Sequence, residues 1–403
     1  MSTTGGTMSG EIKHVSNAHC SDDWNAAASF GVEQAKRVRA FHASFPTYRP
    51  TALRRLDGLA ARLGVGALFV KDESTRFGLN AFKGLGGSYS VGRLLAQRAG
   101  VPEGDLTFGR LLQDDVREIA KGLTIVTATD GNHGRGIAWT ARELGASAVV
   151  YLPKGSSLER LENIRALGAQ AEIVDLNYDD AVRLAARHAE ERGWVLVQDT
   201  AWEGYEDIPT WIMQGYTTLA LEASEQLGEE MPTHVFLQAG VGAMSGAVTA
   251  FIADRYRDSR PVVVIVEPNA ADCVYRTAAA DDGELHIVGG DLDTIMAGLS
   301  CGEPCSIGWQ MLSRFADCFV SVPDEIAELG MRVLARPVGG DAPIVSGESG
   351  AVTTGLVVEL MTNESLAGLR AAIGLGPESR VLCVSTEGDT DRESYRRIVG
   401  GEG

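Results

Sequence analysis

Short apolar runs alternate with helix-length amphipathic stretches through the middle of this 403-residue chain. This alternation restricts the fold more than any other feature, because each run suits one buried strand and each stretch suits one helix. The expected strands are 123–129, 147–152, 171–175 and 195–199, and the expected helices between them are 134–144, 157–167 and 179–192. Strand–helix–strand units of this kind are right-handed and build a parallel sheet covered by helices.

A second series of the same kind begins near residue 208. Its expected strands are 234–238, 262–267 and 381–386, and its expected helices are 208–226, 243–255, 324–335 and 349–362. The sequence therefore predicts an α/β protein with two doubly wound open sheets, joined near 199–208. In open parallel sheets, ligands bind beyond the carboxyl ends of the strands, so the polar residues that follow each strand are the first candidates for a functional site.

Composition and charge exclude several kinds of partner and site. A formal net charge of −18 argues against nucleic acid and anionic membranes as partners, since both require clustered positive charge. No run of about 18 apolar residues indicates a membrane span. The stretch up to residue 10 lacks the apolar core of a signal peptide. The six cysteines are scattered without zinc spacing, so free thiols in a reducing cytoplasm and no metal site are expected.

Lysine is scarce in this chain, which contains only six lysines, the last of them at position 154. Lys83 differs from the others because Phe82 precedes it and glycines follow it, in the sequence GLNAFKGLGG. A partly desolvated lysine has a lowered pKa and attacks an aldehyde readily. The alternative is a solvated lysine in a glycine-rich loop.

A glycine-rich segment, QAGVGAMSGA at 238–247, joins an expected strand to an expected helix. Its glycines let backbone N–H groups converge, and the helix N-terminus adds positive potential, so the segment suits a phosphate group. The segment fits a dinucleotide fold as well, because Glu267 ends the next strand about 20 residues later. A nicotinamide-dependent (NAD-type) oxidoreductase is therefore an alternative at this point.

Three further strand ends carry polar side chains that suit catalysis. The segment TATDGNHGRG at 127–136 suggests a cradle for a substrate carboxylate, in which Asp130 would carry a proton or bind a substrate cation. Asp199, at the end of another strand, is a second candidate carboxylate. A hydroxyl of Ser385 or Thr386 is placed to bond a ring nitrogen. The alternatives are a capped strand–helix turn, a turn aspartate and a polar C-terminal loop, respectively.

Together these segments resemble the fold-type II pyridoxal-phosphate (PLP) enzymes, the group of tryptophan synthase β and threonine deaminase. Within that group, the chain resembles the 2,3-diaminopropionate ammonia-lyases most, over residues 76–391. The matching stretches are RFGLNAFKGLGGSY, TATDGNHGRGIAW, QDTAWEGYEDIPTWIMQGY, MAGLSCGEP, SGESGA and STEGDTD. Threonine deaminases carry a small residue where this chain has Asp130, which favours the diaminopropionate branch.

The resemblance implies a role for each candidate residue. Lys83 would hold the PLP aldehyde, Asn132 would bind the phenolic oxygen of the ring, and Thr386 the ring nitrogen. The phosphate cup would be formed by Gly240, Val241, Gly242, Ala243 and Gly246. Asp130 and Asp199 would be the two catalytic aspartates and would contact the substrate. Further substrate contacts are expected from Thr129, His133 and Ser88.

The same resemblance implies a homodimer of chains that each have two domains. Residues 1–85 and 200–403 would form a large domain that binds the PLP phosphate. Residues 86–199 would form a small domain with the carboxylate loop, and the cofactor would lie in the cleft between the domains. Some relatives carry a disulfide at positions that resemble Cys273 and Cys301, but Cys305 lies close by and leaves this pairing open.

The implied reaction is the PLP-dependent α,β-elimination of 2,3-diaminopropionate, as the D isomer, the L isomer or both, to pyruvate and two molecules of ammonia. Lys83 would serve one face of the substrate, and Asp130 or Asp199 the opposite face. A neutral ring nitrogen beside Thr386 would favour elimination over transamination. Serine, threonine, 3-hydroxyaspartate and larger 2,3-diamino acids are alternative substrates for the same site. A non-catalytic binding protein of the same fold is a more distant alternative.

Overall fold

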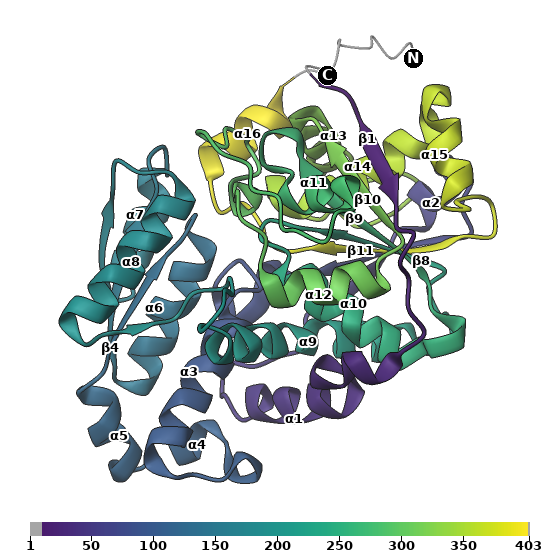
Figure 1. Ribbon diagram of the computed structural model, residues 1–403. Helices are drawn as coiled ribbons and strands as arrows, with labels where there is room; N and C mark the ends of the chain where they lie inside the picture. The colour runs from purple at the N-terminus through teal and green to yellow at the C-terminus, as the bar shows by residue number, and fades with distance from the viewer. Residues whose placement is uncertain (1–9, 402–403) are drawn as a thin grey trace.

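The computed structural model describes residues 10–401 and arranges them around two β-sheets (Figure 1). The larger sheet within this range consists of β1 (Lys13–Ser16), β2 (Ala52–Arg55), β3 (Ala67–Asp72), β8 (His234–Gln238), β9 (Val262–Pro268), β10 (Cys318–Val322) and β11 (Arg380–Ser385). Its strand order is β1-β10-β9-β8-β11-β3-β2. The smaller sheet consists of β4 (Thr124–Ala128), β5 (Ser147–Leu152), β6 (Gln170–Ile173) and β7 (Val195–Leu196). Its order is β6-β5-β4-β7.

Helices cover both faces of the larger sheet, as Figure 1 shows. One face packs against α2 (Asp57–Leu63), α13 (Asp324–Ala335), α14 (Glu348–Thr362), α15 (Ala367–Ala372) and α16 (Arg392–Gly400). The opposite face packs against α1 (Val32–Ala43), α9 (Asp207–Leu227), α10 (Ala243–Tyr256) and α12 (Ser306–Phe315). Each face therefore has its own hydrophobic core, and the strands between them are buried on both sides.

The remaining helices surround the smaller sheet or connect elements. They are α3 (Gly84–Ala99), α4 (Phe108–Leu111), α5 (Asp114–Lys121), α6 (Asn132–Leu144), α7 (Leu158–Arg165), α8 (Tyr178–Arg192) and α11 (Cys273–Ala280). Short 3-10 turns lie at η1 (Trp24–Phe30), η2 (Glu73–Gly78), η3 (Glu103–Asp105), η4 (Arg257–Ser259), η5 (Asn269–Ala271), η6 (Ala297–Leu299) and η7 (Glu364–Leu366).

The strand pairing confirms the predicted fold class. Adjacent strands run parallel in both sheets, except that β1 pairs antiparallel with β10 and β2 pairs antiparallel with β3. Helices lie between successive parallel strands, as expected for a doubly wound α/β protein. Strands β1, β2, β3 and β10 lie outside the strands expected from the sequence. The two edge strands are only four residues long and largely polar, and β3 contains Lys71 and Asp72, which interrupt its apolar character.

One predicted strand is shorter than expected. The run 195–199 was expected to be a strand throughout, but β7 ends at Leu196. The hydroxyl of Tyr205 accepts a hydrogen bond from the Gln198 N–H at 2.8 Å and donates to the Leu196 carbonyl at 3.0 Å. A side chain from the following loop thus replaces the next rung of the sheet, and Asp199 lies in a loop rather than in a strand.

Helix α3 connects the two sheets, because it packs against α9 on one side and α6 on the other. Small residues make this close approach possible. A Cβ on Gly86 would lie 2.6 Å from the Tyr216 ring in α9, and a Cβ on Gly136 in α6 would lie 3.0 Å from the Lys83 carbonyl. The glycines after Lys83 are therefore needed for packing. They also fix the position of Lys83, which immediately precedes the helix. The division into domains at residues 85 and 199 stays a prediction.

Residues 10–401 contain neither a membrane-spanning helix nor a cluster of metal ligands. None of the helices in this range has the length and apolar character that a membrane crossing requires. No three His, Cys, Asp or Glu side chains in the same range cluster as ligands for a metal ion. Residues 1–9, on which much of the expectation about a signal peptide rests, lie outside the described residues.

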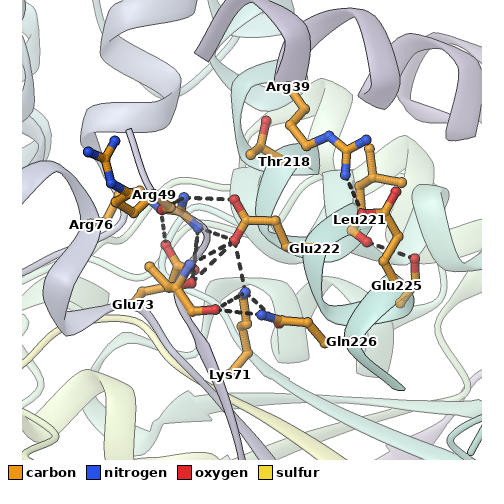
Figure 2. A network of polar contacts seen from close by, with 12 residues as sticks. Arg39, Arg49, Lys71, Glu73, Arg76, Thr218, Leu221, Glu222, Glu225 and Gln226 are labelled. Carbon is orange, nitrogen blue, oxygen red and sulfur yellow. Dashed lines mark hydrogen bonds and ion pairs between the residues drawn. The ribbon is translucent and has the colours of Figure 1, made fainter. Parts of the chain in front are cut away.

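A buried network of charged side chains ties β3 and the turn after it to α9 (Figure 2). The Lys71 ammonium lies 2.8 Å from a Glu222 carboxylate oxygen, and the Arg76 guanidinium lies 2.7 Å from the same oxygen and 2.8 Å from Glu73. Burial alone would raise the pKa of Glu222, but Arg76 and Lys71 lower that pKa to about 2. The network therefore contains ionised groups, and it fixes the segment that leads to Lys83.

The first prediction concerns this network. We expect Glu222→Ala to lower the free energy of unfolding by about 3–5 kcal/mol in urea titrations, because it leaves two buried cations without their shared counterion. Glu225→Ala is the matched control three residues further along α9, where the carboxylate pairs with Arg39 at the surface and contributes less than about 1 kcal/mol. Equal losses of stability in the two variants would contradict this account of the network.

Candidate active site

The ends of strands from both sheets and the start of α3 line one cavity. Eleven of the predicted site residues line it, namely Lys83, Thr129, Asp130, Asn132, His133, Asp199, Gly240, Val241, Gly242, Ala243 and Thr386. Ser88 and Gly246 do not line it. The Ser88 hydroxyl is buried within α3, where it donates to the Leu85 carbonyl at 3.3 Å. A Cβ on Gly246 would lie 2.8 Å from the Gly308 carbonyl, so Gly246 lets α10 pack closely on α12.

Lys83 is the cation of this cavity, and its Nζ forms a close ion pair with the Asp199 carboxylate. The ammonium also lies over two aromatic rings, 5.4 Å from the centre of Phe82 and 5.8 Å from that of Tyr216. Burial would lower the pKa of Lys83, but the negative charges around it, Asp199 foremost, raise that pKa above its usual value. The expectation of a lowered lysine pKa is thus wrong for the free chain. Lys83 must pass a proton to a neighbour before it can act as a nucleophile.

Asp199 is the proton acceptor nearest to Lys83. Its second carboxylate oxygen accepts hydrogen bonds from the Tyr178 hydroxyl and the Gln198 amide, both at 3.3 Å. Burial would raise the pKa of Asp199, but the charge and the hydrogen bond of the Lys83 ammonium hold that pKa well below its usual range. The carboxylate is therefore ionised, and its hydrogen bonds fix the direction in which it meets the lysine.

Asp130 differs from Asp199 because one of its oxygens has no partner. The Oδ2 atom is buried and makes no hydrogen bond within residues 10–401. The neighbouring Thr129 hydroxyl accepts the N–H groups of Gly131 and Gly134 at 2.9 Å, so Thr129 caps α6. Because Thr129 supplies this cap, the Asn132 side chain is not needed for it and lies in the cavity wall. A buried carboxylate oxygen without a partner is costly, and a cationic ligand would compensate for it.

His133 is a neutral side chain at the same end of the cavity. Its Nε2 donates to the Val197 carbonyl at 2.9 Å, so Nδ1 carries the free lone pair. Nδ1 lies 3.7 Å from the Asp199 carboxylate and makes no hydrogen bond within the described residues. Burial lowers the pKa of His133, which keeps the ring uncharged. His133 therefore limits the space around Asp199 and adds no positive charge.

The glycine-rich segment, between the end of β8 and the start of α10, forms the cavity wall next to the one that carries Lys83, Asp130 and Asp199. Gly242 has a φ of +89°, in the left-handed region that favours glycine. A Cβ on Gly240 would lie 3.2 Å from the Cys301 sulfur and from the Gly298 carbonyl. Residues at the start of the 14-residue helix α10 line the cavity, and the backbone N–H groups of a helix N-terminus suit an anionic group such as a phosphate.

Glu267, the residue that left a dinucleotide fold open, is already engaged. Its carboxylate accepts the N–H groups of Val274 and Tyr275 at 3.0 and 2.6 Å and so caps α11. It is also absent from the cavity lining. A carboxylate that caps a helix is not available to bind a ribose hydroxyl, so the geometry does not support the oxidoreductase alternative.

A third wall lies at the end of β11, where Thr386 is the cavity hydroxyl. Ser385 points elsewhere, since its hydroxyl donates to Ser346 at 2.7 Å. The Thr386 hydroxyl accepts from the Gln238 amide at 3.0 Å and donates to the Glu387 carboxylate at 2.6 Å. Gln238 and Glu387 both line the cavity as well.

Several cavity residues received no role in the sequence analysis. They are Phe82, Tyr178, Gln238, Ala239, Met244, Ser245, Gly298, Leu299, Cys301, Ser349 and Glu387. Glu387 and Gln238 adjoin residues that were assigned a role, so their position next to a strand end was the available signal. Tyr178 begins α8 and carries no motif signal of its own. All six cysteines are free thiols in the structure, Cys273 and Cys301 among them.

These three walls fit PLP. The cofactor requires an amine for its aldehyde, N–H donors for its phosphate and a partner for its ring nitrogen. Lys83, the 240–243 segment and Thr386 supply these groups from different elements around the cavity. The buried Oε1 of Gln238, Oδ2 of Asp130 and Nδ1 of His133 have no partner within residues 10–401, as expected where a polar ligand binds.

Comparison with known proteins agrees with this assignment. A family model described as pyridoxal-phosphate dependent enzyme matches residues 44–387. The diaminopropionate ammonia-lyase of Salmonella typhimurium (strain LT2) is 53% identical over 366 residues, which cover 90% of this chain and 91% of the relative. The enzyme of the same name from Escherichia coli (strain K12) is 50% identical over 372 residues, which cover 92% of each chain.

Solved structures give the same result. The crystal structure of Escherichia coli diaminopropionate ammonia lyase in complex with an aminoacrylate-PLP azomethine reaction intermediate has a TM-score of 0.89 and 47% identity, and covers 97% of each chain. Threonine deaminase isoform 2 of Solanum lycopersicum shares the fold, with a TM-score of 0.71 and 17% identity over 96% of each chain. The chain therefore belongs to the pyridoxal-phosphate dependent enzymes and, within that family, to the group of the diaminopropionate ammonia-lyases.

Proposed function

We propose that this chain uses PLP to eliminate ammonia from 2,3-diaminopropionate and releases pyruvate and a second ammonia. The observation that carries the proposal is the charge balance of the cavity. Lys83 pairs with Asp199, and the Asp130 carboxylate remains uncompensated beside them. A substrate with a second ammonium group supplies the missing positive charge. The names of the relatives support the same substrate.

The residues divide the chemistry as follows. Bound PLP supplies the electron sink that withdraws negative charge from the substrate α-carbon. Lys83 holds the cofactor, and the backbone of residues 240–243 binds its phosphate. Asn132 binds the phenolic oxygen of the ring, and Thr386 binds the ring nitrogen. Asp199 orients Lys83 and receives its proton when the amine must act as a base. The N–H groups at the start of α6 and the Thr129 loop hold the substrate carboxylate.

Asp130 has two tasks in this proposal. Its partner-free oxygen accepts a hydrogen bond from the β-ammonium group, which leaves the β-carbon as neutral ammonia. On the face of the substrate away from Lys83, the same carboxylate takes the α-proton of the other enantiomer. His133 stays neutral and shapes the wall next to Asp199. Ser88 has no part in the proposal, because its hydroxyl lies inside α3.

A panel of β-substituted amino acids tests the substrate. We expect 2,3-diaminopropionate to give two molecules of ammonia per pyruvate, and serine, threonine and 3-hydroxyaspartate to react at least tenfold more slowly. A hydroxyl group gives the buried Oδ2 atom of Asp130 no cationic partner, and a tenfold rate difference requires the loss of only about 1.4 kcal/mol of transition-state stabilisation. Turnover of serine at or above that of diaminopropionate would overturn the assignment and favour a dehydratase.

Lys83 is tested by the visible absorbance of the bound cofactor. We expect Lys83→Ala, reconstituted with PLP, to lose the absorbance band of the lysine-bound cofactor and all pyruvate formation, because no other cavity amine is described. Lys154→Ala is the matched control, since that side chain is 74% exposed and pairs with a surface aspartate. An unchanged spectrum in Lys83→Ala would rule out the assigned lysine.

Asp130 is tested by the two enantiomers separately. We expect Asp130→Asn to reduce kcat/KM for at least one enantiomer of diaminopropionate by about a hundredfold, the scale of acid–base catalysis. Asp175→Asn removes an exposed carboxylate of the same sheet region and should leave both rates unchanged. Near-normal rates of Asp130→Asn on both isomers would assign Asp130 a structural role only.

We further propose that the protein is a cytoplasmic homodimer, with domains divided as the sequence predicted. The resemblance to fold-type II enzymes supports this arrangement. Light scattering of the purified protein should give twice the mass of one chain. A monomeric mass with full activity would count against the dimer.

A further inference from the structure

The hydrogen bonds around Thr386 have a consequence for the ring nitrogen that this residue is proposed to bind. A lone hydroxyl can donate to a neutral pyridine nitrogen, so the resemblance alone implies that this nitrogen is neutral. The structure places two further side chains against the hydroxyl. Thr386, Gln238 and Glu387 are buried to within 4% exposure, and all three line the cavity.

The hydroxyl has one hydrogen, and the Glu387 carboxylate lies in position to take it. The Thr386 Oγ1 to Glu387 Oε2 distance is 2.6 Å, which is typical of a hydrogen bond between a hydroxyl and a carboxylate. The other oxygen of Glu387 accepts the Gly350 N–H, near the start of α14, at 2.7 Å. With its hydrogen committed to an ionised Glu387, Thr386 presents only lone pairs to the cavity.

Gln238 presents an acceptor at the same place. Its amide nitrogen lies 3.0 Å from the carbonyls of Ser349 and Val384 and from the Thr386 hydroxyl, three acceptors for two hydrogens. Its carbonyl oxygen Oε1 is buried and has no partner within residues 10–401. The side chains that contact the Thr386 hydroxyl therefore present acceptors to the cavity. A neutral ring nitrogen, which is itself an acceptor, would find no donor among Thr386, Gln238 and Glu387, whereas a protonated ring N–H would find several acceptors.

We propose that Glu387 is a positioning residue that, through the Thr386 hydroxyl, holds the ring nitrogen of bound PLP in its protonated form. The inference rests on the proposed function, because it takes Thr386 as the partner of that nitrogen. Glu387 and the ring share one proton across Thr386. When Glu387 is ionised, the ring nitrogen keeps the proton. When Glu387 takes it, the carboxyl donates to Thr386, and the Thr386 hydrogen turns to the neutral ring.

Backbone hydrogen bonds fix the positions of Thr386 and Glu387 relative to Lys83. The Phe82 N–H donates to the Thr386 carbonyl at 3.0 Å, and Ala81 and Glu387 form an antiparallel bridge. The segment just before Lys83 is thus paired directly with the segment that carries Thr386 and Glu387. The amine and the ring-nitrogen partner are therefore fixed relative to each other before any ligand binds.

The charges around Glu387 leave the position of the shared proton adjustable. Burial raises the pKa of Glu387 to about 7, and the negative charges of Glu348 and Asp130 raise it as well. The hydrogen bonds from Thr386 and Gly350 lower this pKa in part. From α14 the carboxyl accepts the Gly350 N–H and is close enough to Glu348 to be affected by its charge. Asp130, from the loop after β4, also affects it by charge, and Lys83 lines the same cavity. A positive ring nitrogen favours the ionised form of Glu387.

Nitrogen NMR of the holoenzyme tests the proposal. The enzyme is reconstituted with PLP that carries ¹⁵N in the ring, and the ring resonance is compared between variants at pH 7.5. We expect the wild-type resonance near the protonated-pyridine position and a shift of Glu387→Gln to the neutral-pyridine position. The glutamine amide donates to Thr386, which frees the Thr386 hydrogen for the ring. Glutamine also keeps the oxygen that accepts the Gly350 N–H, so the end of α14 stays capped.

Glu348→Gln is the matched control, because it removes a buried carboxyl of the same helix end that does not bond Thr386, and its resonance should stay at the wild-type position. Identical resonances in the wild type and Glu387→Gln would overturn the proposal. If Glu387→Gln does not fold, Thr386→Val breaks the same link, and a wild-type resonance in that variant would have the same meaning. Loss of the visible cofactor band in the wild type would instead reject the proposed function itself.

Discussion

The buried ion pair between Lys83 and Asp199 is the contact on which the candidate site depends. Lys83 lies between β3 of the larger sheet and α3, whereas Asp199 follows β7 of the smaller sheet. The ion pair therefore connects the larger sheet region to the smaller sheet at the cavity where the cofactor is proposed to bind. A buried pair is stable only when its geometry is good and its other hydrogen-bonding atoms are satisfied. Tyr178 and Gln198 meet that requirement for Asp199.

The rest of the fold holds this geometry in place. Glycines in α3 and α6 bring the helices close enough for Lys83 to reach the end of the smaller sheet. The charged network around Glu222 fixes β3 and the turn that leads to Lys83. Backbone hydrogen bonds then connect the Lys83 segment to Thr386. Packing and polar contacts thus place the Lys83 amine, the glycine-rich segment 240–243, the Thr386 hydroxyl and Asp130 around one cavity.

Sequence patterns identified those features whose signals are local. The limits of α6, α8, α9 and α10 agree with their predicted ranges within two residues, because amphipathic periodicity marks a helix well. Lys83, Asp130 and the 240–243 segment stood at strand ends or beside glycines, where ligand-binding residues concentrate. The short edge strands β1 and β2 gave no such signal. Ser88 and Gly246 were placed in the site by motif position, but their orientation within a helix turns them into packing contacts.

What the sequence did not reveal depends on contacts between distant segments. The raised pKa of Lys83 requires Asp199, 116 residues away in the chain. The acceptors around Thr386 become apparent only when β8 and β11 lie side by side. Likewise, the helix cap that occupies Glu267 depends on the turn after β9. Motifs therefore identified the candidate residues, and the fold showed which hydrogen-bond and ion-pair partners surround them.

The central claim is a covalent bond between the Lys83 Nζ and the cofactor aldehyde, and borohydride reduction with peptide mass mapping tests it most directly. The chain has only six lysines, so each lysine can be followed separately. The account predicts that the reduced cofactor mass is found on the peptide that contains Lys83. An unmodified Lys83, or a label on any other lysine, would contradict it.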